Sequence, residues 1–280
     1  MRIGFGKLMA ASAVVVAGLV WLLMSNRPTI SSNSSESPTA GSANQQEKTL
    51  TLYYAAGLQA PVNEITTAYE ASHHVHVETE VGGSGTLLSQ ILVSGGDVFL
   101  AADRFYLDEA SQKNLAPLIV PVAYQFPVIV VHKGNPKRIS ALKDLLKPQV
   151  RVSLADPQRA AIGRAVGDLL EKDDRWEPLW KKAVTHTATV NEVATNVKLG
   201  GADAGIVWNT TAAQVPDLEV VRVPEFDSAK SEIAAGLLKS SKDPQAAQEF
   251  LRYLTNPDEG LKVFARHGYA VAVTKAPVPR

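Results

Sequence analysis

The chain has 280 residues, of which 45% are hydrophobic and 20% are charged, a composition typical of ordinary globular proteins. Its 28 basic and 28 acidic residues balance, so it lacks the basic excess expected of a nucleic-acid-binding protein. It contains no cysteine, which excludes disulfides, thiolate metal sites, a catalytic thiol and a lipid-modified N-terminal cysteine. The length predicts about two domains.

The N-terminal segment predicts export. Arg2 and Lys7 precede an uncharged apolar stretch, residues 8–24, and Arg27 is the first charge after it. This stretch exceeds the usual ~7–15 apolar residues of a signal peptide and reaches the ~17 needed to span a membrane. No small-x-small cleavage site follows, so we expect residues 1–24 to be an uncleaved anchor rather than a cleaved signal. The remaining chain would then be periplasmic or otherwise extracytoplasmic.

Residues 25–47 are rich in serine and asparagine and predict a flexible linker. Strand and helix patterns alternate beyond it. The strands are expected at residues 49–56, 75–81, 97–102, 150–155, 204–208 and 218–223. The helices are expected at residues 61–73, 86–94, 104–113, 141–147, 160–172, 176–183, 190–201, 244–255 and 257–268. Such alternation is typical of a parallel sheet that is covered by helices on both faces.

Residues 118–136 form a β-rich stretch that Pro121 and Pro127 interrupt, and it is long enough to cross between two domains. We therefore predict an α/β, two-lobed architecture in which each lobe is a mainly parallel sheet flanked by helices. The first lobe would comprise residues 48–125 plus 231–280, and the second residues 126–230. A ligand cleft is expected between the lobes, at the carboxyl ends of the strands.

The stretch "EVGGSGTLLSQIL", residues 80–92, places three glycines and Ser84 where a predicted strand becomes a helix. Glycine allows close backbone approach, and a helix N-terminus presents unpaired N–H groups and partial positive charge. The stretch therefore indicates an anion site, although Ser84 has the alternative role of capping the helix.

Six segments, taken in order, carry a resemblance to a known family: "YYAAGLQAPVNEI", "GGSGTLLSQI", "GDVFLAADRFYLD", "DPQRAAIGRAVGDLL", "VNEVATNV" and "GIVWNTTAA". Together they resemble the periplasmic molybdate-binding proteins of ABC importers, a family of type II solute-binding proteins, over residues 48–270. Tungstate- and sulfate-binding proteins share this architecture. The resemblance implies a monomeric, non-enzymatic protein that closes on a tetrahedral oxyanion, such as molybdate or tungstate, and delivers it to an ABC permease.

The resemblance also implies the ligand-binding residues. Ser84 matches a hydroxyl donor of the family, and Ile162 and Val193 match backbone N–H donors at helix starts. Gly57 stands where the family usually has serine, and Trp208 stands where it has tyrosine. The sequence therefore does not determine which oxyanion is preferred. No protein-ligated metal and no cofactor are implied.

Other interpretations remain open at this stage. The ligand could be sulfate or phosphate, and a membrane-tethered sensor would share the same sequence features. An exported enzyme is a further alternative, but no GxSxG, HExxH or Walker A motif is present. Arg159 and Arg164 flank the predicted anion loop. Their side chains are interpreted either as solvated surface groups or as charged contacts to the anion.

Polar side chains outside the predicted site have structural interpretations as well. His74 and His76 would share a strand face, where an exposed surface is favoured over a metal site. Three aspartates at loop starts are expected to cap helices or pair with arginines: Asp97, Asp103 and Asp156.

Overall fold

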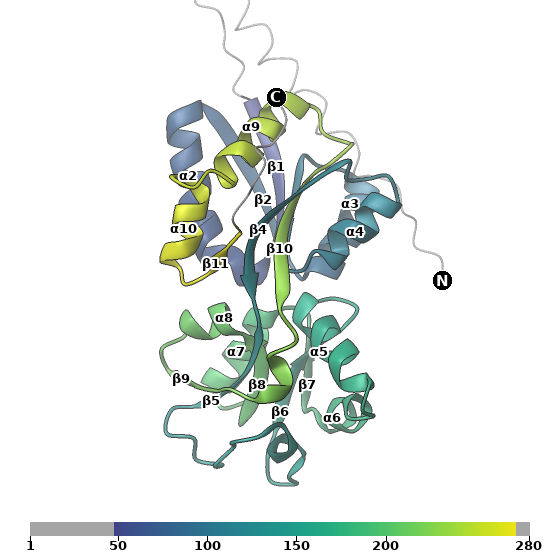
Figure 1. Ribbon diagram of the computed structural model, residues 1–280, viewed down its shortest axis with the longest axis vertical. Helices are drawn as coiled ribbons and strands as arrows, with labels where there is room; N and C mark the ends of the chain where they lie inside the picture. Colours follow the sequence, from purple (N-terminus) through teal and green to yellow (C-terminus); the bar gives the residue numbers. More distant parts are fainter. Residues whose placement is uncertain (1–47, 273–280) are drawn as a thin grey trace, which may run out of the picture. The chain divides into compact units, whose positions relative to one another are not determined.

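The structure, a computed structural model, describes residues 48–272, whose strands form two sheets (Figure 1). The sheet of the first lobe has the order β11-β4-β10-β3-β1-β2. Its strands are β1 (Lys48–Ala55), β2 (Val75–Gly82), β3 (Val98–Ala101), β4 (Leu118–Gln125), β10 (Ser231–Leu237) and β11 (Ala270–Val271). The sheet of the second lobe has the order β7-β6-β8-β5-β9. Its strands are β5 (Pro127–His132), β6 (Val152–Ala155), β7 (Thr185–Thr187), β8 (Ala204–Trp208) and β9 (Leu218–Val221).

Helices cover both faces of each sheet, which confirms the predicted α/β class. In the first lobe, α2 (Gln59–His73), α9 (Pro244–Leu254) and α10 (Gly260–Arg266) lie on one face, and α3 (Ser84–Ser94) and α4 (Phe105–Gln112) on the other (Figure 1). In the second lobe, α7 (Val190–Lys198) and α8 (Asn209–Ala213) pack together, as do α5 (Ala161–Glu171) and α6 (Trp176–Lys182). Apolar periodicity explains the packing of α2, because Val62, Ile65 and Tyr69 share its buried face.

Each sheet contains both parallel and antiparallel strand pairs, and the connections between the strands explain which pairs are which. β1 pairs in parallel with β2 and β3, and β6 pairs in parallel with β7 and β8, because helical crossovers join these strands. The strands next to the lobe crossings pair antiparallel: β10 with β3 and β4, and β5 with β8 and β9. The chain runs from β4 into β5 through Phe126 and returns to the first lobe between β9 and β10, past the short 3-10 helix η3 (Pro224–Phe226).

Several short elements differ from the sequence predictions. The helix expected over residues 141–147 is the 3-10 helix η2 (Leu142–Leu146), which Pro148 prevents from continuing. β7, α8 and β11 were not predicted, because segments of two to five residues are too short to show a hydrophobic period. The helix expected over residues 257–268 is shortened to α10.

Within residues 48–272, none of the helices is both long and apolar enough to cross a bilayer. The predicted anchor or signal (residues 1–24) and the predicted linker (residues 25–47) lie outside the described residues.

The core of the second lobe depends on a close approach between β8 and α7 at Gly205. A Cβ on Gly205 would lie 2.5 Å from Val193 Cγ1 and 3.1 Å from Val197 Cγ2. We expect Gly205→Ala to lower the free energy of unfolding by about 1–3 kcal/mol, since added volume in a packed core forces strain. Urea unfolding measures the change.

Gly167→Ala is the matched control. A Cβ there would make ordinary contact with Trp176, at 3.4 Å, and alanine favours the helix. The control should unfold at or above the urea midpoint of the wild type. A Gly205→Ala variant as stable as this control would contradict the packing analysis.

Candidate functional site

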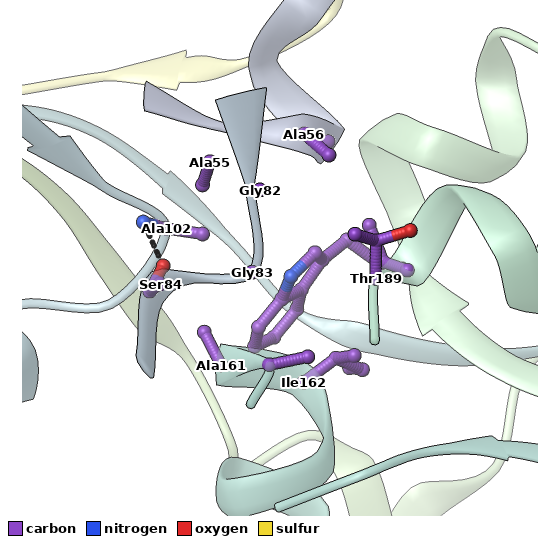
Figure 2. A pocket seen from close by; sticks show the side chains of 13 residues that line it. Ala55, Ala56, Gly82, Gly83, Ser84, Ala102, Ala161, Ile162 and Thr189 are labelled. Atoms are coloured by element: carbon purple, nitrogen blue, oxygen red, sulfur yellow. Dashed lines mark hydrogen bonds between the residues drawn. The ribbon is translucent and has the colours of Figure 1, made fainter. Parts of the chain in front are cut away.

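A small cavity lies between the lobes, where strands of both sheets end and helices begin (Figure 2). It encloses about 230 Å³, including space that is open to solvent. The first lobe lines it with Ala55, Ala56, Gly57, Gly82, Gly83, Ser84 and Ala102. The second lobe lines it with Ala160, Ala161, Ile162, Thr189, Val190 and Trp208. None of these lining residues has a charged side chain.

Three helices, α3, α5 and α7, start at this cavity. The residues that precede α3 and α5, Gly83 and Ala160, form no side-chain cap. First-turn N–H groups have no intrahelical acceptor, and each helix start carries partial positive charge. In α3 the N–H groups of Gly85 and Thr86 donate to the Arg159 carbonyl, so these two are not available to a ligand. Helix starts from both lobes nevertheless converge on this space, and their partial positive charge suits an anion.

Ser84 lines the cavity and is the first-lobe lining residue with a hydroxyl group; 1% of its surface is exposed. Its Oγ accepts a hydrogen bond from the Ala102 N–H at 3.2 Å (Figure 2). Because an oxygen that accepts this bond still carries its own hydrogen, the hydroxyl can donate to a ligand. No side-chain capping bond involves Ser84 in the described structure; the residue before it, Gly83, holds the N-cap position.

Of the other predicted site residues, Gly57, Ile162 and Trp208 also line the cavity. Ile162 is the second residue of α5, so its N–H belongs to the unpaired first turn. Trp208 ends β8 and is 1% exposed. Its indole N–H is a donor without acceptor capacity.

The structure does not place Val193, a predicted site residue, in the lining of the cavity. Val193 is the fourth residue of α7, where the N–H already has an intrahelical acceptor, and its side chain packs on Gly205. Val190, the first residue of α7, lines the cavity instead. A sequence signal marks this start: Thr189 accepts from the Glu192 N–H, and Glu192 accepts from the Ala188 N–H, a T-x-x-E capping pattern.

Two residues that the sequence did not point to donate to backbone carbonyls beside the cavity, and one of them links the lobes. Asn191 of the second lobe donates from Nδ2 to the Ala56 carbonyl at 2.9 Å. Within the first lobe, the Tyr269 hydroxyl donates to the Gly57 carbonyl at 2.9 Å. Burial raises the pKa of Tyr269 to about 12, so this hydroxyl keeps its proton at neutral pH.

The glycines of residues 80–92 serve a contact between the two lobes. The N–H groups of Gly85 and Thr86 donate to the Arg159 carbonyl, at 3.0 and 3.3 Å. A Cβ on Gly83 would lie 2.2 Å from that carbonyl oxygen, and one on Gly85 would lie 2.1 Å from the Gln158 carbonyl oxygen. A side chain at either position would keep the lobes apart.

An ion pair also joins the lobes. Arg164 of α5 donates to Asp103 at 2.8 Å, and its guanidinium lies 4.0 Å from the centre of the Phe105 ring. Asp103 also accepts from the Phe105 N–H, so it both caps a turn and pairs with an arginine. Arg164 is therefore neither a solvated side chain nor part of the cavity lining, whereas Arg159 is exposed.

The remaining polar candidates have structural roles. Asp97 accepts from the Thr51 N–H at 2.8 Å, and Asp156 accepts from the Gln158 N–H at 2.8 Å. His74 does not lie on a strand, contrary to the prediction, because it ends α2 in the left-handed conformation. His76 pairs with Glu70, and the described residues hold no cluster of three potential metal ligands.

Two lobes joined by two chain crossings, with an uncharged cavity between them, form the architecture of a solute-binding protein. The chain belongs to the family of bacterial extracellular solute-binding proteins, which matches residues 50–270. It is thus an extracytoplasmic protein, as the export signal predicted.

Individual relatives agree with this assignment. A Haemophilus influenzae protein with "binding protein" in its name is 30% identical over 229 residues, 81% of this chain and 93% of that protein. The molybdate-binding protein ModA of Mycobacterium tuberculosis is 28% identical over 263 residues, 92% of this chain and 95% of ModA. The solved sulfate-binding protein SubI of M. tuberculosis matches the fold with a TM-score of 0.69 at 18% identity, covering 79% of this chain and 86% of SubI.

The glycine contact between the lobes leads to a prediction about closure. Since the chain has no cysteine, Val93→Cys and Leu199→Cys would place one spin label on an exposed position of each lobe. In this background Gly83→Ala and Gly85→Ala should remove the short label-to-label distance of the closed lobes. Pulsed electron paramagnetic resonance, recorded with a panel of inorganic anions, measures that distance.

Gly167→Ala is the control, because Gly167 lies outside the cavity lining and a Cβ there makes only ordinary contact with Trp176, at 3.4 Å. It should keep the short distance. If Gly83→Ala and Gly85→Ala also keep it, the glycines are not required for closure.

Proposed function

We propose that the protein captures a tetrahedral oxyanion, molybdate or tungstate, in the cavity between its lobes and delivers it to an ABC permease. The observation that carries the proposal is the lining of the cavity. Helix starts from both lobes and the Ser84 hydroxyl supply donors, and no lining side chain is charged. Neutral dipoles of this kind can hold a fully deprotonated anion without a buried counter-ion.

The size of the cavity favours a small inorganic ion. The free space inside it is about 10 Å³, close to what a single water molecule needs, so the closed cavity has no room for an organic solute. Molybdate carries no proton at neutral pH, so its binding site needs only hydrogen-bond donors. Monohydrogen phosphate carries a proton, so its site also needs a hydrogen-bond acceptor. The lining side chains include no carboxylate that could accept that proton. The similarity to ModA supports molybdate over phosphate.

Sulfate is the second candidate, because it too is unprotonated and because a sulfate-binding protein shares the fold. Gly57 and Trp208 replace the serine and tyrosine that the resemblance leads us to expect, and both changes alter the size and donor count of the cavity. The discrimination between sulfate and the larger molybdate would therefore depend on the fit of the closed lobes.

We further propose that a monomer works at the outer face of the cytoplasmic membrane, held by residues 1–24 or released by cleavage after them. Capture and delivery need no catalytic group and no cofactor. A tethered sensor of the same anion would use an identical site, and loss of anion uptake on deletion of the gene would favour transport.

Thermal unfolding of residues 48–280 with separate oxyanions tests the proposed ligand. A ligand at 100 times its Kd adds about 2.7 kcal/mol to the stability of the folded state. For a chain of this length we expect molybdate and tungstate to raise Tm by roughly 5 °C or more. A rise with sulfate or phosphate alone would assign a different anion, and no rise with any oxyanion would contradict the proposal.

Ser84→Ala tests the assigned site. The change removes the one first-lobe hydroxyl that lines the cavity and leaves the buried Ala102 N–H without its acceptor. We expect the Kd for molybdate, measured by calorimetry, to rise at least about tenfold, equal to about 1.4 kcal/mol. Ser89→Ala, at an exposed position of the same helix, is the control and should bind as the wild type does. Equal affinity of the Ser84→Ala variant would show that the site is assigned wrongly.

A further inference from the structure

A series of buried hydrogen bonds leads from the two chain crossings to Ser84. Gln125 ends β4 directly before the first crossing, and Ser231 begins β10 directly after the second. The two residues lie opposite each other in the sheet of the first lobe. Both are polar, yet Gln125 is 1% exposed and Ser231 is 4% exposed. Because a polar side chain is costly to bury unless it is hydrogen-bonded, the partners of these two side chains indicate their role.

Both side chains donate to one backbone carbonyl, that of Ala102. Gln125 Nε2 donates to its oxygen at 2.9 Å, and Ser231 Oγ donates to it at 3.0 Å. A carbonyl oxygen has two lone pairs, so these two donors use its full acceptor capacity. Ala102 lines the cavity and comes directly after β3, which ends at Ala101. Side chains, rather than a paired strand, therefore fix the backbone at this point of the cavity wall.

The backbone N–H of Ala102 in turn holds the Ser84 hydroxyl. It donates to Ser84 Oγ at 3.2 Å (Figure 2). Since the oxygen of Ser84 accepts this bond, its own hydrogen is left for a ligand. The direction in which Ser84 can donate thus depends on where the Ala102 N–H lies.

A hydrogen bond from the second lobe sets the orientation of the Gln125 amide. Thr210, on α8, donates from Oγ1 to Gln125 Oε1 at 3.0 Å. This bond turns the amide oxygen towards α8 and leaves the amide NH₂ group for the Ala102 carbonyl. Thr210 is itself 1% exposed, so the whole network is shielded from water. It links the junction of the two lobes to the hydroxyl that lines the cavity.

We propose that Gln125 and Ser231 are positioning residues, which fix the backbone of Ala102 and thereby hold the Ser84 hydroxyl ready to donate to the bound anion. The inference rests on the proposed function, because it assigns a supporting network to the Ser84 donor. Neither Gln125 nor Ser231 is among the residues that line the cavity, so both act through Ala102. They raise the affinity by preorganisation, since a donor that is already fixed loses less conformational freedom when the ligand binds.

A double-mutant cycle with Ser84→Ala tests the inference. Gln125→Met roughly keeps the volume of the side chain but removes its hydrogen bonds, and Ser231→Ala removes one of the two donors to the Ala102 carbonyl. We expect Gln125→Met to raise the Kd for molybdate about 3- to 10-fold and Ser231→Ala about 2- to 5-fold, within the range of one neutral hydrogen bond. In the Ser84→Ala background each change should alter the Kd by less than about twofold, because a positioning residue has no effect without the donor that it positions.

The same cycle separates positioning from a purely structural role. If the two side chains only stabilise the fold, their effect on the Kd is absent, or it is equal with and without the Ser84 hydroxyl. Thr255→Val is the control, since it breaks a bond of 2.8 Å between a buried first-lobe hydroxyl and the Leu251 carbonyl, outside the cavity lining. It should lower Tm without ligand and leave the Kd unchanged.

Calorimetry of the wild type with molybdate, tungstate and sulfate distinguishes the two possible failures. If the wild type binds none of these anions, the proposed function and the positioning role both fail. If the wild type binds one of them and Ser84→Ala weakens that binding, the positioning role alone is overturned when the Gln125 and Ser231 variants bind as the wild type does, or when they lose equal affinity in both backgrounds. The positioning role also fails if Ser84→Ala binds as tightly as the wild type.

Discussion

The backbone contact between the start of α3 and the Arg159 carbonyl is the constraint on which the cavity depends. It brings the first turn of α3 against the loop that leads into α5, and so fixes how closely helix starts of the two lobes approach each other. Gly83 and Gly85 make that approach possible, because side chains at either position would overlap backbone oxygens of the second lobe. Each hydrogen bond of this kind contributes only about 0.5–1.5 kcal/mol net. The closed arrangement is therefore held weakly by the protein alone, and an anion that bonds both lobes would add the stabilisation that shifts the equilibrium towards closure.

The two chain crossings are the places where closure can bend the chain without disturbing either sheet. At the first crossing, Phe126 is fixed to the second lobe, because its N–H and carbonyl both bond to Asn209 at 2.9 Å. Arg222, at the start of the second crossing, lies 4.9 Å from the centre of the Phe126 ring, so the two crossings touch. The bond from Thr210 to Gln125 spans the same junction. A rotation of the lobes about these crossings would break few contacts near the axis and more at the cavity, as in a hinge motion.

The sequence predicted the features that depend on local residue patterns. It did not predict the features that depend on contacts between residues far apart in the chain. The order of strands and helices follows from periodicity, and Ser84 was predicted as a site residue because glycines and a serine at a strand-to-helix junction suit an anion. Val193, which was expected near the start of α7, is the fourth residue of that helix, since a helical period shows which face is buried but not which residue begins the helix. The capping pattern from Thr189 to Glu192 contained that information. The contacts of Arg164 with Asp103, and of Asn191 with Ala56, join segments 61 and 135 residues apart, and no local pattern reveals such pairs.

The distribution of charge around the cavity suits reversible capture. The ion pair between Arg164 and Asp103 joins the lobes outside the cavity lining, with side chains that are 19% and 13% exposed. When the lobes separate, both groups regain water, so breaking this partly solvated pair costs little net free energy. A counter-ion inside the cavity would behave differently, because it would remain buried and unpaired after the anion left, at a cost of several kcal/mol. Neutral donors at helix starts avoid that cost. They can return to water when the lobes open, and this allows a protein that binds an anion firmly to release it as well.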